Sequence, residues 1–450
     1  METINKYLSG TIVPIALVIF STLFWIKLKG RPFSNPRYMV SAIFGNKRSD
    51  GGIKAIMLAL AGTLGVGNIV GVASAIALGG AGAVFWMWIS AFLAMILKYC
   101  EVVLSILHRR IRNGENYGGA MYYMKDYFAK INRNRIGAVF VFVFVLFCLI
   151  NAFTMGGIIQ ANAISESAGI TLNIDGRIVG AFLGVMCIIV FMFNGKRIFT
   201  ICEKLVPFVS VLYLVMSLAV IFLSYQSVPA ILMDIVKSAF AFESATAGVF
   251  GFFLSKSLRY GTIRGLFSNE AGCGTSPIAH ATSRTENPVK QGVLGIVEVF
   301  IDTIVVCTMT ALVILINGDN MQSGGDNPIS IVYSSYAAFL GGISDILLCI
   351  SIFLFAFATI ICWGYYGKEC IYYFSKRKLA ERIYYCFYIL AIYFGAFINL
   401  DLIWELADLA IGGMTIMNLF VLYKMRKEIA NTTELYIKKS PQMRALWVKR

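Results

Sequence analysis

The chain has 450 residues, of which 58% are apolar and only 14% are charged. A soluble domain carries about 25% charged residues, so this composition excludes a soluble enzyme and indicates a protein embedded in a lipid bilayer. The net charge of +15 is attributed to loops on the cytoplasmic side, not to nucleic-acid binding. The ten cysteines form no CxxC pair, which speaks against a disulfide framework or a metal site.

Eleven apolar segments are candidates for membrane-spanning helices, since about 18 apolar residues suffice to cross the hydrocarbon core. The first lacks the basic n-region and the small-residue cleavage site of a signal peptide, so it is interpreted as a retained helix. The expected spans are 8–26, 53–80, 83–107, 136–162, 177–195, 203–224, 237–258, 290–316, 344–366, 382–398 and 401–423. The predicted fold class is therefore an all-α, polytopic membrane protein.

The basic residues predict the orientation. Cytoplasmic loops are enriched in Lys and Arg, and alternate loops of the eleven-span scheme hold 35 of the 39 basic residues, against three on the other side. This asymmetry predicts an outer N-terminus and a cytoplasmic C-terminus. A shorter apolar stretch, 329–340, is expected to form a helix over the outer mouth, and residues 431–450 are expected to be a solvated tail.

The second expected span is interrupted by glycine. The run Gly62-Thr-Leu-Gly-Val-Gly-Asn-Ile-Val-Gly71 has four glycines in ten residues, and each weakens a helix by about 0.8–1.0 kcal/mol relative to Ala. Broken backbone is tolerated inside a bilayer where it lines a cavity or is buried in protein. The freed N–H groups suit a carboxylate, and the freed carbonyls suit Na⁺. Close packing of helices through small residues is the alternative.

The seventh expected span contains a second glycine-bearing interruption, over residues 240–251. It lies five spans after the first and runs in the opposite direction. Equivalent breaks in two inverted five-helix halves point to a transporter site near the midplane. The expected divisions are 1–50 for an extra N-terminal helix and its loop, 51–226 and 227–424 for the two repeats, and 425–450 for a cytoplasmic tail.

Polar residues inside the expected spans are further candidates, because charges within the bilayer are costly and pair or line water. Lys98 and Glu101 are expected to pair with each other as a structural element. The role of Asp302, four residues after Glu298, is left open between a structural partner and a functional group, and Glu243 is expected to be interfacial. The segment 265–280 matches no enzyme motif and is expected to be a tight cytoplasmic gate loop.

Several motifs resemble the alanine or glycine:cation symporter family over about 51–424. They are 62–72, 79–88, the Lys98-Tyr-Cys-Glu-Val-Val103 run, 118–123, 265–280 with its Ser268-Asn-Glu-Ala-Gly272 core, and the Phe300-Ile-Asp-Thr303 run. The resemblance implies a variant of the leucine-transporter fold, with a 5+5 inverted repeat and one extra N-terminal helix. It also implies sodium-driven symport of alanine or glycine, with Na⁺ as the coupling ion and no other cofactor.

The resemblance also implies site residues. Those expected at the substrate are Thr63, Gly65, Val66, Gly67, Asn68, Gln160, Thr246, Ala247, Gly248, Phe250, Thr359 and Trp363. Carbonyls of Ala61, Leu64 and Phe355 and the hydroxyl of Thr359 are expected to bind sodium. The chain departs from the family at Ala358, where a second hydroxyl is common, and at Ala247, where glycine is common. The added methyl of Ala247 favours a small substrate.

The sequence therefore predicts a secondary transporter of the bacterial or archaeal inner membrane that works by alternating access. Its expected partners are a small neutral amino acid, sodium and the lipid bilayer, without nucleic acid; the oligomeric state stays open. Coupling to protons through Asp302 or Glu298 is the alternative within transport. An ion channel is the alternative from another class, but two different breaks in one chain disfavour symmetric pore loops. A membrane enzyme lacks a plausible catalytic constellation.

Overall fold

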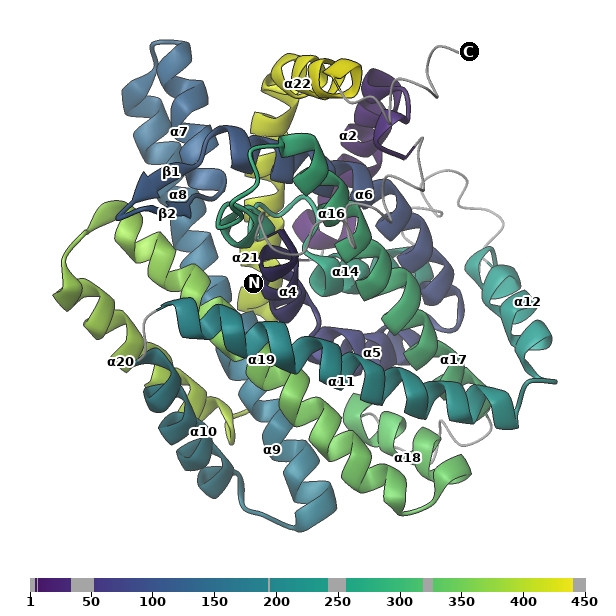
Figure 1. Ribbon diagram of the computed structural model, residues 1–450. Coiled ribbons are helices and arrows are strands. Elements are labelled where there is room, and N and C mark those ends of the chain that lie inside the picture. Colours follow the sequence, from purple (N-terminus) through teal and green to yellow (C-terminus); the bar gives the residue numbers. More distant parts are fainter. Residues whose placement is uncertain are drawn as a thin grey trace.

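The computed structural model describes residues 5, 7–33, 52–192, 195–241, 256–318 and 327–439. These ranges are almost entirely helical (Figure 1). The helices are η1 (Leu8–Ile12), α2 (Val13–Leu28), η2 (Arg31–Phe33), α4 (Gly52–Thr63), η3 (Val66–Asn68), α5 (Val70–Gly79), α6 (Gly82–Leu107), α7 (Ala120–Lys130), α8 (Asn134–Phe153), η4 (Thr154–Ile158), α9 (Ile159–Leu172), α10 (Gly176–Phe191), α11 (Gly195–Leu223), α12 (Val228–Ala239), α14 (Lys256–Asn269), α15 (Ser276–His280), α16 (Pro288–Val299), η5 (Phe300–Cys307), α17 (Thr308–Ile316), α18 (Pro328–Leu340), α19 (Ile343–Phe374), α20 (Lys378–Gly395), α21 (Asp401–Lys424) and α22 (Arg426–Lys439). One antiparallel hairpin, β1 (Arg110–Arg112) with β2 (Glu115–Tyr117), joins α6 to α7.

The long apolar runs of the sequence form helices that are long enough to cross a membrane. Seven helical segments of the described residues are long and apolar enough to cross a bilayer, and the bent pair α4 and α5 makes an eighth. The all-α membrane fold is thus confirmed, whereas the count of eleven spans and the repeat stay predictions. The span expected at 237–258 is not a single helix, because α12 ends at Ala239 and α14 begins at Lys256, with 242–255 outside the described residues.

The helices pack in two groups. Each group combines helices from distant parts of the chain, and members of the two groups alternate along the sequence. In one group, α14 and α16 lie along α6, with α4 and α5 beside them (Figure 1). In the other, α19 packs on α9 and α20, and α10 packs on α20. The helix α11 packs against both α4 and α19. Side chains from α4, α9 and α19 therefore meet inside the protein, at the break between α4 and α5.

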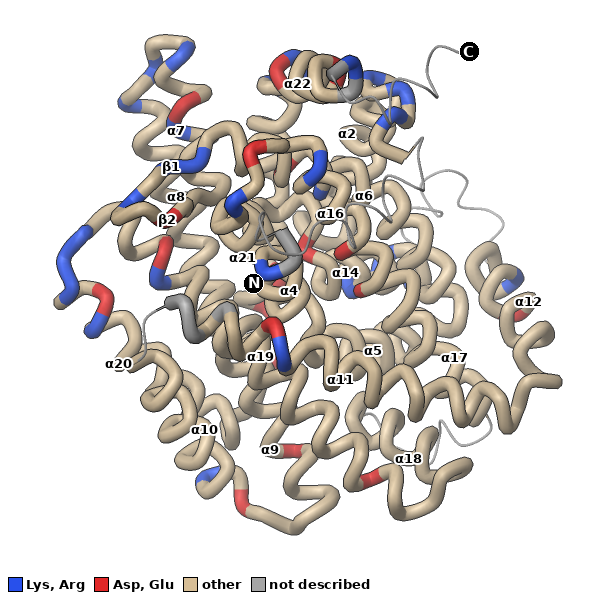
Figure 2. Tube along the Cα trace, viewed as in Figure 1, with Lys and Arg blue, Asp and Glu red and all other residues tan. Residues whose placement is uncertain are grey.

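Charged residues gather at one end of the molecule. Figure 2 shows Lys and Arg concentrated around α7, α22, the hairpin and the start of α20.

One part of the expected topology is wrong, because 256–269 is not a loop but helix α14. It begins at the turn between α5 and α6, where Ser257 Oγ donates to the carbonyl of Gly79 over 2.6 Å. Lys256 therefore lies beside a turn that the eleven-span scheme places outside.

Two shorter predictions have clear outcomes. The helix expected at 329–340 is present as α18. Of the tail 431–450 that is expected to be solvated, 431–439 continue helix α22, which packs against α2, α6 and α16. Most of its described side chains are exposed or half-buried, whereas Thr433 is buried, with its Oγ1 2.8 Å from the hydroxyl of Tyr99. Residues 440–450 lie outside the described part.

Candidate functional site

The predicted break in the second span is present between α4 and α5. The two helices differ in direction by 61°. Gly65 is extended, with φ −128° and ψ −155°, and the short helix η3 follows it. The N–H of Gly65 donates to the carbonyl of Thr63 over 2.9 Å and to Asn68 Oδ1 over 3.2 Å. The chain thus leaves the α-helical pattern in the middle of the fold, where its backbone groups bond to other partners.

Two side chains from the second packing group close over this break. Gln160 Oε1, on α9, accepts from the N–H of Val66 over 3.1 Å. Thr359, on α19, lies so near that a β-carbon added to Gly65 would be 2.6 Å from its hydroxyl oxygen and 3.0 Å from Gln160 Oε1. Glycine at 65 is therefore required by close approach, since the backbone angles suit other residues as well. The break is a meeting point of α4, α9 and α19.

The expected sodium ligands lie partly together. The Thr359 hydroxyl is 2.9 Å from the carbonyl oxygen of Ala61 and 3.1 Å from that of Phe355. All three residues are buried. Hydroxyl and carbonyl oxygens are the donors that Na⁺ takes in broken-helix sites, so this donor set suits the ion. The fourth expected ligand, the carbonyl of Leu64, follows Thr63 at the end of α4.

The remaining predicted residues have varied surroundings. The Thr63 hydroxyl donates within its own helix, to the carbonyl of Ala59 over 3.3 Å. A β-carbon on Gly67 would contact the ring of Phe267 at 3.0 Å. Trp363 is buried and packs on Gly156, while its Nε1 lacks a hydrogen-bond partner in the described structure. The predicted residues Thr246, Ala247, Gly248 and Phe250, together with Glu243, lie outside the described residues.

Asn68 connects the break to residues that the sequence did not place at the site. Its Nδ2 donates to Asp302 Oδ1 over 2.8 Å and to Ser268 Oγ over 3.0 Å. Ser268 Oγ in turn donates to Asp302 Oδ2 over 2.5 Å, and Thr303 Oγ1 donates to the same oxygen over 2.9 Å. Asp302 is therefore held by side-chain donors from three segments. Its proximity to Asn68 was not visible in the sequence, because 234 residues separate the two.

A second break lies opposite the first, between α14 and α15. Glu270, Gly272 and Gly274 all have positive φ, of 53°, 92° and 85°. Such values are uncommon for a residue with a β-carbon and favour glycine. This segment belongs to the stretch expected to be a cytoplasmic gate loop, and that expectation is wrong: 265–280 is wholly buried. It is a helix end, a break and a short helix, packed against α4 and α6.

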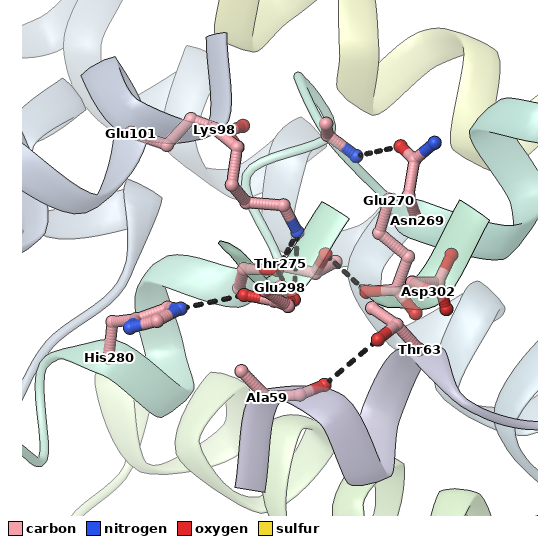
Figure 3. Close-up of polar contacts among 12 residues, drawn as sticks. Ala59, Thr63, Lys98, Glu101, Asn269, Glu270, Thr275, His280, Glu298 and Asp302 are labelled. Carbon is pink, nitrogen blue, oxygen red and sulfur yellow. Dashed lines mark hydrogen bonds and ion pairs between the residues drawn. The ribbon is translucent and has the colours of Figure 1, made fainter. Parts of the chain in front are cut away.

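Buried charged residues surround this second break (Figure 3). Lys98 Nζ pairs with Glu298 Oε1 over 3.1 Å, and both side chains are fully buried. Lys98 also donates to Ser276 on α15. Glu298 Oε2 is 2.8 Å from His280 Nε2. The pair of cation and carboxylate thus joins α6, α15 and α16, and it supports the short helix that follows the break.

Glu101 has different partners from those expected. Its Oε1 accepts from the N–H of Gly274 over 2.7 Å and from Asn418 Nδ2 over 2.5 Å. The expected ion pair between Lys98 and Glu101 is therefore wrong, since Lys98 pairs with Glu298. Glu101 instead ties the second break to α21. The expectation rested on the spacing of Lys98 and Glu101, which are three residues apart on one helix. Such spacing does not reveal partners that come from other helices.

Two solved membrane transporters have a similar arrangement of helices. A sodium-coupled sialic acid symporter has a TM-score of 0.50 at 12% identity, covering 94% of this chain and 86% of that chain. A manganese transporter variant from Eremococcus coleocola also has a TM-score of 0.50, at 14% identity, covering 82% of this chain and 75% of that chain. At these identities the likeness shows the fold alone. The fold and the apolar helices thus define a multi-pass membrane protein.

The family follows from the sequence comparison. Residues 1–448 match the sodium:alanine symporter family, and the chain belongs to it. Sodium/alanine symporter AgcS of Methanococcus maripaludis is 32% identical over 97% of this chain and 96% of its own length. An uncharacterized transporter of Haemophilus influenzae is 35% identical over 98% and 96%. The probable sodium/glutamine symporter GlnT of Bacillus subtilis is 34% identical over 96% and 89%.

Proposed function

We propose that the protein carries a small neutral amino acid, alanine or glycine, across the cell membrane together with Na⁺. The observation that carries this proposal is the contact of Gly65 with Thr359 and Gln160. One atom, Thr359 Oγ1, lies against both the broken backbone and the carbonyl oxygens of Ala61 and Phe355. Through Thr359, a ligand bound at the broken backbone is proposed to affect an ion bound at the two carbonyl oxygens, and the reverse.

The substrate carboxylate is proposed to bind the N–H groups of the first break. Gln160 Oε1 accepts from Val66 N–H, and the substrate carboxylate is proposed to replace this neutral acceptor. The exchange favours the charged ligand, because hydrogen bonds to ionised groups are roughly twice as strong as neutral ones. The amino group is left for carbonyl or hydroxyl oxygens near the break. Gln160 is then proposed to hold the N–H of Val66 and to release it to the substrate carboxylate.

Sodium is proposed to bind at the carbonyl oxygens of Ala61, Leu64 and Phe355 and at the hydroxyl of Thr359. Sodium would join α4 to α19, which belong to different packing groups. If sodium holds α4 and α19 together, the affinity of the break for substrate rises. Linkage then requires that bound substrate raise the affinity for sodium by the same factor. Alternating access follows if the two groups move relative to each other while the site stays between them. An outer N-terminus and a cytoplasmic C-terminus are part of this proposal.

Uptake by proteoliposomes tests the proposal. Labelled alanine and glycine should accumulate when an inward Na⁺ gradient is imposed, and accumulation should stop when K⁺ replaces Na⁺. A pH gradient without Na⁺ is the arm that tests proton coupling. Competition by unlabelled valine, leucine and glutamine measures the size limit expected from Ala247. Uptake that is equal in K⁺ and Na⁺ would refute sodium coupling.

A further inference from the structure

A basic cavity lies on the charged end of the molecule, away from both breaks. Its volume is about 210 Å³. The side chains of Arg110 on the hairpin, Lys125 on α7 and Lys376 after α19 line it, together with four tyrosines. Two of these, Tyr122 and Tyr373, are in edge-on contact with ring centroids 5.3 Å apart. The cavity thus combines cationic groups and phenol hydroxyls, which suits an anion that accepts several hydrogen bonds.

The charge in the cavity is not balanced by the protein. Arg110 Nη2 is engaged by Asp126, at 2.6 and 2.7 Å from its two oxygens. Lys125 and Lys376 have no ion-pair partner among the described residues, and both are exposed. The nearby carboxylate of Glu369 is already paired with Lys368 over 3.0 Å. Two cationic side chains therefore face the cavity without a counter-charge.

The rim of the cavity continues into an apolar surface. The ring of Tyr373 contacts that of Phe374, with centroids 5.0 Å apart, and Phe374 contacts Phe142 of α8 at 5.8 Å. Both phenylalanines are about half exposed, at 51% and 54%, and Val139 one turn away is 65% exposed. The segment Asn134–Leu172 is one of the candidate membrane spans. Tyrosines gather where a protein surface passes from lipid to water, so the cavity lies at the membrane interface.

We infer that this cavity binds the headgroup of an anionic phospholipid, with the phosphate at Lys125 and Lys376 and the acyl chains along α8. A soluble anion would use the two lysines but gain nothing from the row of exposed rings. A zwitterionic lipid would use the rings but bring its own cation to a cationic cavity. Only an anionic lipid matches both parts of the surface. Basic pockets between helices at the cytoplasmic interface bind such headgroups in other membrane proteins.

Lipid binding to the detergent-solubilised full chain tests the inference, with native mass spectrometry as the readout. The probes are short-chain phosphatidylglycerol, phosphatidylcholine of the same chain length, and glycerol phosphate. Wild type should bind phosphatidylglycerol in preference to both others. The variant carrying Lys125→Gln and Lys376→Gln should lose about 25-fold in phosphatidylglycerol affinity, at about fivefold for each lysine near a charged lipid. Its phosphatidylcholine binding should not change.

The matched control carries Lys27→Gln and Lys29→Gln, which remove the same charge from the exposed end of α2. It should bind phosphatidylglycerol like wild type. An equal loss in both double variants would overturn the inference, because it would show a response to net charge alone. Binding of glycerol phosphate as tight as that of the lipid would overturn the lipid assignment. These readouts do not involve transport, so they stand apart from the outcome of the sodium experiment.

Discussion

At the first break, between α4 and α5, the backbone meets neutral groups: the amide of Gln160 and the hydroxyl of Thr359. At the second, between α14 and α15, it meets charged ones. Glu101 accepts from Gly274 N–H, and Lys98 donates to Ser276 on the following helix. Neutral partners can be exchanged for a charged ligand at little cost, whereas buried ionic partners are costly to separate. The comparison assigns ligand binding to the first break and mechanical support to the second.

The largest effect is expected at the second break. Lys98→Met would leave Glu298 buried with its cationic partner removed, and losing one member of a buried pair costs about 3–5 kcal/mol. The melting temperature of the detergent-solubilised protein should fall steeply. The double variant Lys98→Met with Glu298→Gln should recover much of the loss, because position 298 then carries no buried charge. A Lys98→Met protein that melts like wild type would remove the supporting role of this pair.

The next effect is expected at the first break. Gly65→Ala would place a β-carbon 2.6 Å from Thr359 Oγ1. Overpacking of this kind costs about 1–3 kcal/mol. We expect this cost to fall on the arrangement that binds substrate, where it corresponds to a loss of roughly 5- to 150-fold in affinity. The matched control is Gly71→Ala, six residues along the same broken span, because a β-carbon there meets nothing within 4 Å. Equal alanine uptake by the two variants would show that the first break does not face the ligand.

A smaller effect is expected on the affinity for Na⁺ when the Thr359 hydroxyl is removed. Thr359→Ala removes a hydroxyl that lies 2.9 Å from the carbonyl of Ala61. At about 1.4 kcal/mol per decade, the half-saturating Na⁺ concentration should rise roughly tenfold. Thr359→Ser should restore it, and Thr63→Ala should leave it unchanged, because that hydroxyl donates to the carbonyl of Ala59, which is not a proposed sodium ligand. If Thr63→Ala and Thr359→Ala shift the sodium curve equally, the sodium assignment is wrong.

The smallest effect lies outside both breaks, where His108 joins the end of α6 to α7 and α22. Burial opposes its charge, but hydrogen bonds to Asp126 and Glu428, at 2.8 and 2.9 Å, outweigh burial and raise its pKa. A raised histidine pKa contributes stability that is complete below about pH 6.5 and is lost as pH rises through the raised value. The difference in melting temperature between wild type and His108→Gln should therefore shrink from pH 6 to pH 9. A difference that is constant with pH would mean that His108 acts without its charge.

The sequence located the first break because four glycines fall within one apolar run. It missed the second, although Gly272 and Gly274 were in view, because the segment 265–280 was interpreted as a cytoplasmic loop. In the structure, α14 packs along α6, and Arg264 lies over the ring of Trp404 at 4.5 Å. A cation buried against an aromatic ring of a distant helix cannot be inferred from its neighbours in the chain.

The sequence also could not show which residues on different helices contact each other. Thr359 was placed beside Ala61 through resemblance to a family, and the structure brings the two together across 298 positions. The partner of Lys98 was sought on its own helix, at Glu101, whereas the fold supplies Glu298 from 200 positions away. Composition and glycine spacing therefore predict that helices cross the membrane and where one of them breaks. They do not predict which buried charges meet.

Equilibrium binding of alanine to the purified protein, in Na⁺ and in choline buffers, tests the central claim most directly. Wild type and Gly71→Ala should bind alanine more tightly in Na⁺, since both ligands are proposed to meet at the first break. Gly65→Ala should lose alanine affinity, and the effect of Na⁺ on it should fall as well. Alanine binding by Gly65→Ala with the affinity and sodium dependence of wild type would contradict the claim that the first break is the shared site.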